Sequence, residues 1–368
     1  MACVEAGFCG SCGTVKMPDT LSLLVKTRWE ELLEALAAHQ ALLALGDDDA
    51  AQTTYERFRA RLLRWFYLEA VWLLPPYAER IRPRPGGQAS YFQTETRTAT
   101  ANLAVFDRKL ELLPPEEPAR SRFLVAYFAD LSAFRDYLEH HFLRLLHHLS
   151  PALEAELQEE ELRFLHHHIE EALWDVPLPA LPWSAHPPEA RPVPPAFQTP
   201  ELSWWWETPL DGSQLRERIQ LEAQESFFRF QVGLLYQDAQ RAQEELLALL
   251  EALRRLFAAN HAEWDDFYDS LPGFRNGRSL LEGHERRIEE LLLALAHATA
   301  SLSACPDGRS WWLAWTELWD RSQLTHYVMR FYLERSWAAL IEQVPRKAAL
   351  SWQTTFRRLH PAARWLNT

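Results

Sequence analysis

Glycine, cysteine and strand-like alternation are all scarce in this sequence, and each shortage narrows the choice of fold. Only 12 of the 368 residues are glycine, and few windows show the Val, Ile or Thr alternation of β-strands. Leu, Ala, Glu, Gln and Arg, which favour helices, dominate outside the proline-rich segments. The sequence therefore predicts an all-α protein.

Long apolar runs and a surplus of basic residues are also absent. No run of about 18 apolar residues exists to span a bilayer, and the first residues lack the basic and then apolar pattern of an export signal. The formal net charge of −13 disfavours nucleic acid, because phosphate binding needs clustered Lys and Arg. We expect a cytoplasmic protein without a membrane span or a nucleic-acid partner.

Histidine is enriched around one stretch, residues 134–151 (FRDYLEHHFLRLLHHLSP). Leucine and phenylalanine recur there at helical spacing, and Pro151 is placed where a helix would stop. Seven of the 14 histidines lie between residues 140 and 168. Three adjacent ones, residues 166–168, point about 100° apart around a helix and cannot share one ion, so we expect them to be mostly solvated.

Helical periodicity and the positions of proline divide the chain into five parts. Residues 175–211 hold ten of the 23 prolines and predict an extended linker. The other parts are a Cys-containing tail at residues 1–16, an N-terminal helical bundle at 17–174, a C-terminal helical bundle at 212–345 and a basic C-terminal helix at 346–368.

Two parts of the chain predict a protein partner. Three consecutive tryptophans, Trp204–Trp206, are too apolar to remain in water, so they must dock against the protein or a partner. Residues 346–368 carry five basic residues and no acidic one along an apolar stripe, which suits the acidic body or a partner. The oligomeric state stays open.

Glu69 is the one charged residue between Trp65 and Leu74 (WFYLEAVWLL), in a helix that is apolar all round. An unpaired buried carboxylate is costly, so Glu69 needs a partner or a proton. We expect it to be either a ligand or half of a structural ion pair, with Arg64 or an arginine of another helix as the partner. The motif FYLEAVW at 66–72 recurs as FYLERSW at 331–337, which indicates either an internal duplication or a chance similarity between leucine-rich helices.

Several stretches resemble the hemerythrin-like (HHE) family of metal-binding four-helix bundles. They are LRWFYLEAVWLLPPYAER (63–80), YLEHHFLRLLHHLSPAL (137–153), NHAEWDDFYDSLPGF (260–274) and LLEGHERRIEELLLAL (280–295). The resemblance implies two tandem four-helix bundles joined by the proline-rich linker. It also implies a di-iron centre held by about five histidines and two carboxylates, used for oxygen binding, sensing or peroxide chemistry.

Carried over residue by residue, the resemblance supplies two partial ligand sets. In the N-terminal half these are His39, Glu69 and His141, although Trp65 and Leu145 stand where the family has a histidine and an acid. In the C-terminal half they are His261, Asp265 and His284. Each set is expected either to hold iron in a mono- or dinuclear site or, with no cofactor, to persist as a hydrogen-bonded cluster.

The tail sequence EAGFCGSC resembles the cluster-binding loop of plant-type [2Fe–2S] ferredoxin domains, with Cys3, Cys9 and Cys12 as the cofactor-binding residues. Five residues separate Cys3 and Cys9 where that family has four, and Cys305 is remote in sequence. The alternative is a tail without a cluster, or an extension upstream of a natural start at Met17.

Three functions follow from these patterns. The first is a hemerythrin-like sensor or carrier with partial or vestigial metal sites. The second is a non-catalytic helical adaptor or assembly factor that holds a partner protein. The third is a non-haem iron oxidoreductase coupled to the N-terminal cysteines. The sequence favours a protein that is not an enzyme, because no high-specificity catalytic motif is present.

Overall fold

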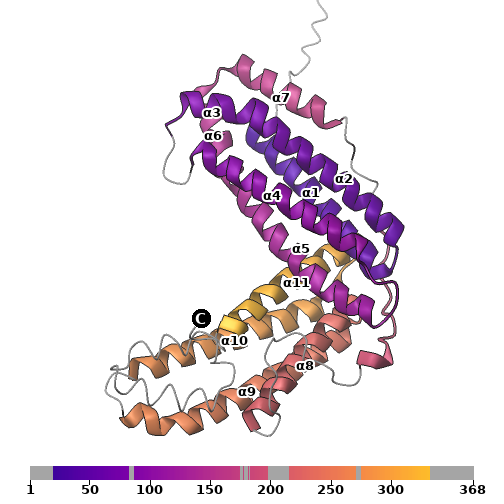
Figure 1. Ribbon diagram of the computed structural model, residues 1–368, viewed down its shortest axis with the longest axis vertical. Coiled ribbons are helices and arrows are strands. Elements are labelled where there is room, and N and C mark those ends of the chain that lie inside the picture. The colour runs from indigo at the N-terminus through magenta and orange to yellow at the C-terminus, as the bar shows by residue number, and fades with distance from the viewer. Residues whose placement is uncertain are drawn as a thin grey trace, which may run out of the picture. The chain divides into compact units, whose positions relative to one another are not determined.

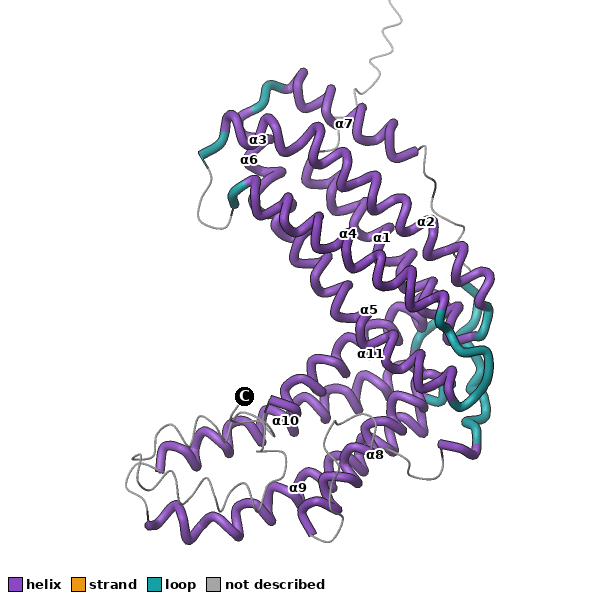
Figure 2. Tube along the Cα trace, in the orientation of Figure 1, coloured by secondary structure: helices purple, strands orange, loops and turns teal. Residues whose placement is uncertain are grey.

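The computed structural model describes residues 20–82, 87–174, 177, 181, 183–197, 215–270 and 275–331. Within these ranges the chain is almost entirely helical and contains no strand (Figure 2). This confirms the predicted all-α fold. The tail with Cys3, Cys9 and Cys12, the three consecutive tryptophans and the basic C-terminal segment lie outside the described residues.

The N-terminal half contains long helices interrupted by two π turns (Figure 1). In chain order the elements are α1 Leu21–Leu45, α2 Asp48–Leu68, η1 Glu69–Leu73, α3 Leu74–Arg80, α4 Ala89–Glu111, α5 Ala119–Arg144, η2 Leu145–Leu149, α6 Ser150–Glu156 and α7 Glu159–Trp174.

The second half contains one short turn before its long helices and another between the last two. The elements are η3 Pro195–Phe197, α8 Leu215–Leu235, α9 Ala239–Ser270, α10 Arg275–Ser301, η4 Leu302–Ala304 and α11 Gly308–Phe331. No described helix has an apolar stretch long enough to cross a bilayer.

The chain forms two compact units whose boundaries run through helices. The first unit comprises Met1–Leu32, Ala60–Thr98 and Glu139–Pro177, and the second comprises Leu33–Arg59, Ala99–Leu138 and Leu178–Thr368. The tandem four-helix bundles and the linker between them stay predictions.

The core of the first unit is built from stacked aromatic rings. Phe142 is fully buried, and its ring stacks on Trp29 with 4.6 Å between centroids and contacts Trp65 at 5.6 Å. The leucine positions that flank Phe142 in the helical pattern are also fully buried. The periodicity of residues 134–151 therefore identified the core-facing side of this helix correctly.

Pro151 does not end the helix, contrary to the sequence expectation. The chain passes through η2 into α6 and turns only at Leu157, which has extended backbone angles. Proline has no N–H to offer the carbonyl four residues earlier, and its ring crowds that carbonyl. The π turn immediately before Pro151 adds a residue to the turn, so the helix continues past the proline.

A π turn followed by proline also occurs between α2 and α3. There η1 is followed by Pro75 and Pro76, and α3 continues the helix to Arg80. Figure 1 shows α3 and α6 side by side at one end of this unit. Both proline-started helices thus form one end of the first unit, next to the buried Glu69.

Two helix–turn–helix hairpins of the second unit have turns of the same geometry. Gly46 after α1 and Gln237 after α8 both have positive φ, 84° and 57°. In each turn the next residue, Asp47 or Asp238, accepts a hydrogen bond from the first turn of the following helix. The left-handed residue closes one helix and the aspartate starts the next.

Arg191 attaches residues of the proline-rich segment to these hairpins. Its guanidinium donates to the carbonyl of Ala44, near the end of α1, and to the carbonyl of Leu235, the last residue of α8, at 3.1 Å. It also lies over the ring of Tyr236, 5.1 Å from the centroid. A cation at two helix C-termini is favourable because the unpaired carbonyls there carry partial negative charge.

Candidate functional site

Glu69 and His141 meet in the interior of the first unit, as the partial ligand set requires. Glu69 Oε2 lies 2.9 Å from His141 Nε2, and both side chains are essentially inaccessible to solvent. The other ring nitrogen, Nδ1, lies 3.0 Å from Glu95 Oε2. Glu95 is partly buried and also pairs with Arg144 at 3.1 Å. A carboxylate, an imidazole, a second carboxylate and a guanidinium thus form one chain of contacts.

Three helical segments place these groups. Glu69 opens the π turn η1, His141 belongs to α5 before η2, and Glu95 comes from α4. The rings of Phe66 and Phe92 pack edge-on against the imidazole, with centroids 5.6 and 6.2 Å away. This apolar wall keeps water from the imidazole and fixes its orientation, so its two nitrogens can reach only the carboxylates.

The charge of His141 follows from these contacts. Burial lowers the pKa of His141, but the negative charges and hydrogen bonds of Glu69 and Glu95 raise it to about 9. His141 is therefore an imidazolium at neutral pH and donates from both nitrogens. With Arg144 included, two cations balance two carboxylates.

In this arrangement both ring nitrogens of His141 contact carboxylates. A histidine binds a metal through a nitrogen lone pair, so a metal ion would have to displace a proton and one of these contacts before His141 could bind it. The two cations also cancel the negative charge that would attract a metal ion. Within the described ranges, no cluster of three or more His, Cys, Asp or Glu side chains has a metal-binding arrangement.

His39 forms a different cluster, in the second unit. It is fully buried, and its Nδ1 lies 2.9 Å from the carbonyl of Ala51, which can only accept a hydrogen bond. Nδ1 is therefore the donor, and Nε2 accepts from the hydroxyl of Tyr127 at 2.9 Å. Burial lowers the pKa of His39 to about 4, so this imidazole is neutral. Its contacts are those of a structural histidine.

The C-terminal set is only partly visible. His261 Nε2 lies 2.7 Å from Glu285 Oε2, so the partner of His261 is the residue next to His284. Glu285 is buried, which the sequence pattern did not predict. The side chain of Asp265 lies outside the described residues, so His261, Asp265 and His284 stay a predicted ligand set.

The remaining histidines of the enriched stretch have separate environments. His140, His147 and His148 are exposed. His166 and His167 each lie 3.6 Å from a glutamate four residues further on. The side chain of His167 is 74% exposed, as expected, whereas that of His166 is only 16% exposed, so the expected solvation is wrong for His166. His168 instead stacks on Trp72, with 5.3 Å between ring centroids and 6° between planes.

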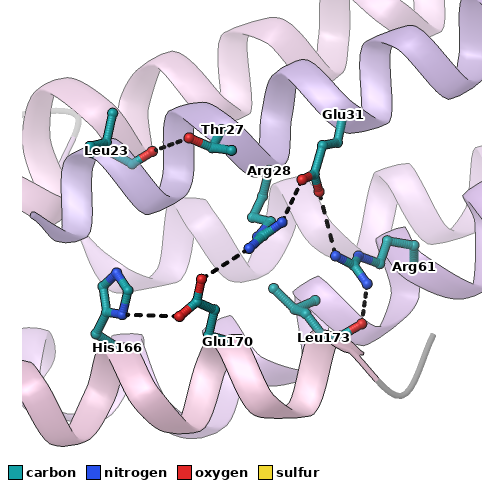
Figure 3. Close-up of polar contacts among 8 residues, drawn as sticks. All are labelled: Leu23, Thr27, Arg28, Glu31, Arg61, His166, Glu170 and Leu173. Carbon is teal, nitrogen blue, oxygen red and sulfur yellow. Dashed lines mark hydrogen bonds and ion pairs between the residues drawn. The ribbon is translucent and has the colours of Figure 1, made fainter. Parts of the chain in front are cut away.

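Helix α7 is fixed against α1 and α2 by charged contacts (Figure 3). Arg61 donates to the carbonyl of Leu173, and Arg64 to that of Ala172 at 3.3 Å, so two cations occupy the C-terminal end of α7. Arg28 reaches Glu170 at 3.3 Å. Figure 3 shows Glu31 of α1 between Arg28 and Arg61. These contacts hold α7 in one position along the bundle.

A cavity of about 390 Å³ opens between η1–α3, Leu157 and α7 in the first unit. Its lining is mainly apolar and aromatic and includes three charged residues. The lining residues are Val71, Trp72, Pro76, Arg80, Leu157, Glu160, Glu161, Phe164 and Leu165. Arg80 and Glu161 form a two-fold hydrogen-bonded pair at 2.8 and 3.0 Å. The cavity is in the size range of ligand and anchor-residue sites. We call it the α7 pocket.

The walls of the α7 pocket are preformed. Three aromatic side chains contact one another here: His168 stacks on Trp72, Phe164 meets Trp72 edge-on at 5.7 Å, and the rings of Phe164 and His168 lie 4.2 Å apart. Phe164 is 52% exposed and Val71 42% exposed, although both are apolar. A rigid aromatic wall with exposed apolar residues at its mouth is typical of a binding surface.

The sequence pattern missed Glu95, Glu285 and the α7 pocket. Glu95 lies in a helix with many polar residues, where a glutamate carries no special signal. The aromatic Phe164, outside the leucine stripe of its helix, was the one available sign of the pocket.

The chain matches no protein-family model, no curated protein and no solved structure. Its function is therefore argued from its own residues.

Proposed function

We propose that the protein is a non-catalytic helical adaptor that binds an amphipathic helix of a partner protein through the α7 pocket. The observation that carries this proposal is the pocket itself, an apolar cavity of about 390 Å³ whose aromatic wall is held in place and whose mouth exposes Phe164 and Val71. Such a cavity suits a large apolar side chain as an anchor.

The exposed surface beside the pocket favours a macromolecule over a small ligand. Tyr67 lies one helical turn before Val71 and is 54% exposed, with Arg64 over its ring at 5.3 Å. The apolar side of this segment therefore extends beyond the cavity. A helix that places residues i, i+3, i+4 and i+7 on one face can cover both the pocket and this surface.

The charges at the mouth favour a basic partner helix. Glu161 is paired with Arg80, whereas Glu160 is exposed and has no ion pair within the described residues. The whole chain carries a formal charge of −13. Lys or Arg beside the apolar anchor would be attracted to this rim, with a stronger effect on association rate than on final affinity.

The geometry gives less support to the metal sensor or carrier and to the iron oxidoreductase. Glu69 and Glu95 contact the imidazole of His141, Arg144 supplies the second cation, and His39 bonds to a carbonyl and a tyrosine. Both functions stay predictions of the family resemblance. Metal analysis and a visible spectrum of anaerobically purified protein test them, because each requires stoichiometric iron.

The adaptor proposal is tested by Phe164→Asp in affinity-purified full-length protein from its source cells. A charge at this exposed position removes the apolar mouth of the pocket without changing the core. Tyr91→Asp is the matched control, since Tyr91 is also aromatic and 46% exposed but does not line the pocket.

We expect a stoichiometric partner to co-purify with the wild type and with Tyr91→Asp, and to be lost with Phe164→Asp. Thermal unfolding of all three proteins should be alike, which checks the fold. An identical set of co-purifying proteins for all three would refute the α7 pocket as the docking site.

A further inference from the structure

A second cavity, on the other side of α3, differs from the α7 pocket in its charge. It has a volume of about 340 Å³ and lies between α3 and the η2–α6 segment of the first unit. Its lining residues are Tyr77, Ile81, Arg82, Gly87, His147, His148, Pro151 and Ala152. We call it the α3 pocket. Neither the metal hypothesis nor the adaptor proposal uses it.

We propose that the α3 pocket binds a small organic oxyanion, a carboxylate or a phosphate monoester attached to a short apolar body. The basic side chains of its lining are Arg82, His147 and His148, and no Asp or Glu is among the described residues that line it. In a chain with a formal charge of −13, this is an unusual concentration of donors.

These three donors are available to a ligand. Arg82, His147 and His148 are exposed. None of the three makes a hydrogen bond or ion pair with another described residue. Several other arginines and histidines of this unit are paired, as with Arg80 and Glu161 or His141 and its two glutamates. A guanidinium presents parallel N–H groups that match a carboxylate or phosphate, and each imidazole adds a donor.

The floor of the pocket is apolar and rigid. Tyr77 is only 3% exposed, its ring meets that of Phe92 edge-on at 6.0 Å, and its hydroxyl donates to the carbonyl of Gly87 at 2.6 Å. Ile81, Pro151 and Ala152 complete an apolar lining. The hydroxyl of Tyr77 is already used as a donor, so the floor offers contact to hydrocarbon and the rim offers contact to charge.

The π turn η2 explains why both histidines border the cavity. It adds one residue to the turn that holds them and so shifts which side chains face α3. Pro151, directly after this turn, is itself part of the lining. The feature that lets the helix pass its proline also sets the direction of the two imidazoles. Functional sites are frequent at such turns.

Calorimetric titration of the full-length wild type with three probes tests the proposal. The probes are phenyl phosphate, 3-phenylpropionate and the neutral 3-phenylpropionamide. We expect at least one of the two anions to bind, and the amide to bind roughly tenfold more weakly or not at all, because it lacks the charge that strengthens such hydrogen bonds. The stronger anion identifies the head group, and equal binding of amide and anions would overturn the proposal.

Variants locate the binding site. Arg82→Gln and His148→Gln should each weaken anion binding roughly tenfold, and the double variant should abolish it, because each removes a charge-assisted donor. The matched control is Arg163→Gln with His167→Gln, which removes the same side-chain types from exposed positions of α7 outside the cavity.

The control double variant should bind the anions as the wild type does, and all variants should melt at the wild-type temperature. Two results would overturn the α3 pocket as the site. One is unchanged binding by the Arg82 and His148 variants, and the other is an equal loss in the control, which would indicate a general effect of net charge.

Discussion

The two buried histidines, His39 in the second unit and His141 in the first, have the same solvent exposure and opposite charge states. The pKa of His39 is lowered to about 4 and that of His141 is raised to about 9, around the ordinary value of 6.5. His39 faces a carbonyl and a tyrosine hydroxyl, whereas His141 faces two carboxylates. Burial favours a neutral imidazole in both places, and partners decide which one keeps its proton.

The comparison also bears on the metal hypothesis. Both histidines were candidate ligands because of their position in the helical pattern, and that pattern reports burial alone. A neutral histidine with a free lone pair is what a metal requires. His39 is neutral but uses its lone pair to accept from Tyr127, and His141 would have to release a proton before it could bind a metal.

The largest effect is expected from Glu69→Ala, which removes one partner from the charged cluster. Breaking a buried ion pair leaves the other charge uncompensated and costs about 3–5 kcal/mol of unfolding free energy. Chemical denaturation at pH 7 measures this loss. The double variant Glu69→Leu with His141→Leu should recover most of it, since Glu95 keeps its contact with Arg144. A double variant as unstable as the single one would contradict the pairing.

The second prediction concerns stability at alkaline pH. Because the pKa of His141 is about 9 in the folded protein and 6.5 ordinarily, its protonation stabilises the fold fully below pH 6.5. The contribution, about 3 kcal/mol from a shift of this size, is lost as the pH rises through 9. Unfolding free energy measured from pH 6 to 10 should fall for the wild type, and the fall should be smaller for His141→Gln.

His39 should show the opposite dependence. Its lowered pKa means that the unfolded chain binds the proton more readily, so stability is complete above pH 6.5 and is lost as the pH falls to about 4. The size is again about 3 kcal/mol. Other groups titrate in this range, so the informative quantity is the difference between the wild type and His39→Gln from pH 7 to 4. Parallel curves for the two proteins would argue against a neutral His39.

A smaller loss is expected from Tyr127→Phe. This change removes the hydroxyl that donates to His39 Nε2 and leaves a buried nitrogen without a donor, which costs about 1–3 kcal/mol. It should also raise the pKa of His39 slightly, because Nε2 becomes free to take a proton. NMR titration of the His39 ring protons measures the pKa, and urea unfolding measures the loss.

The sequence predicted which side chains are buried better than which ones meet. Period and composition identified the helices, the buried Phe142 and the buried Glu69. They named Arg64 or an arginine of another helix as the ion-pair partner of Glu69, whereas the structure gives His141, which only the family resemblance had grouped with Glu69. A helical pattern indicates which face of its own helix a side chain occupies. It does not indicate which residue of a neighbouring helix that side chain contacts.

The π turns were beyond the sequence pattern for a related reason. A proline inside a periodic segment normally ends the helix, and Pro151 was read in that way. Whether the chain breaks or widens its turn depends on what the continuing helix can bury, and here Leu149 and Leu153 are fully buried on either side of Pro151. That gain is a property of the packed unit and cannot be read from one helix.

The smallest effect is expected from Arg144→Gln, at the exposed end of the His141 cluster. Arg144 is 40% exposed as a side chain, and ion pairs of this kind contribute about 0–1 kcal/mol because water screens them. The buried contacts of His141 with Glu69 and Glu95 do not depend on Arg144. The variant should therefore unfold within about 1 kcal/mol of the wild type, and His141 should still titrate near pH 9, which NMR of its ring protons measures. A large drop in that pKa would show that the guanidinium holds Glu95 in place, and the buried imidazolium would then depend on a surface residue.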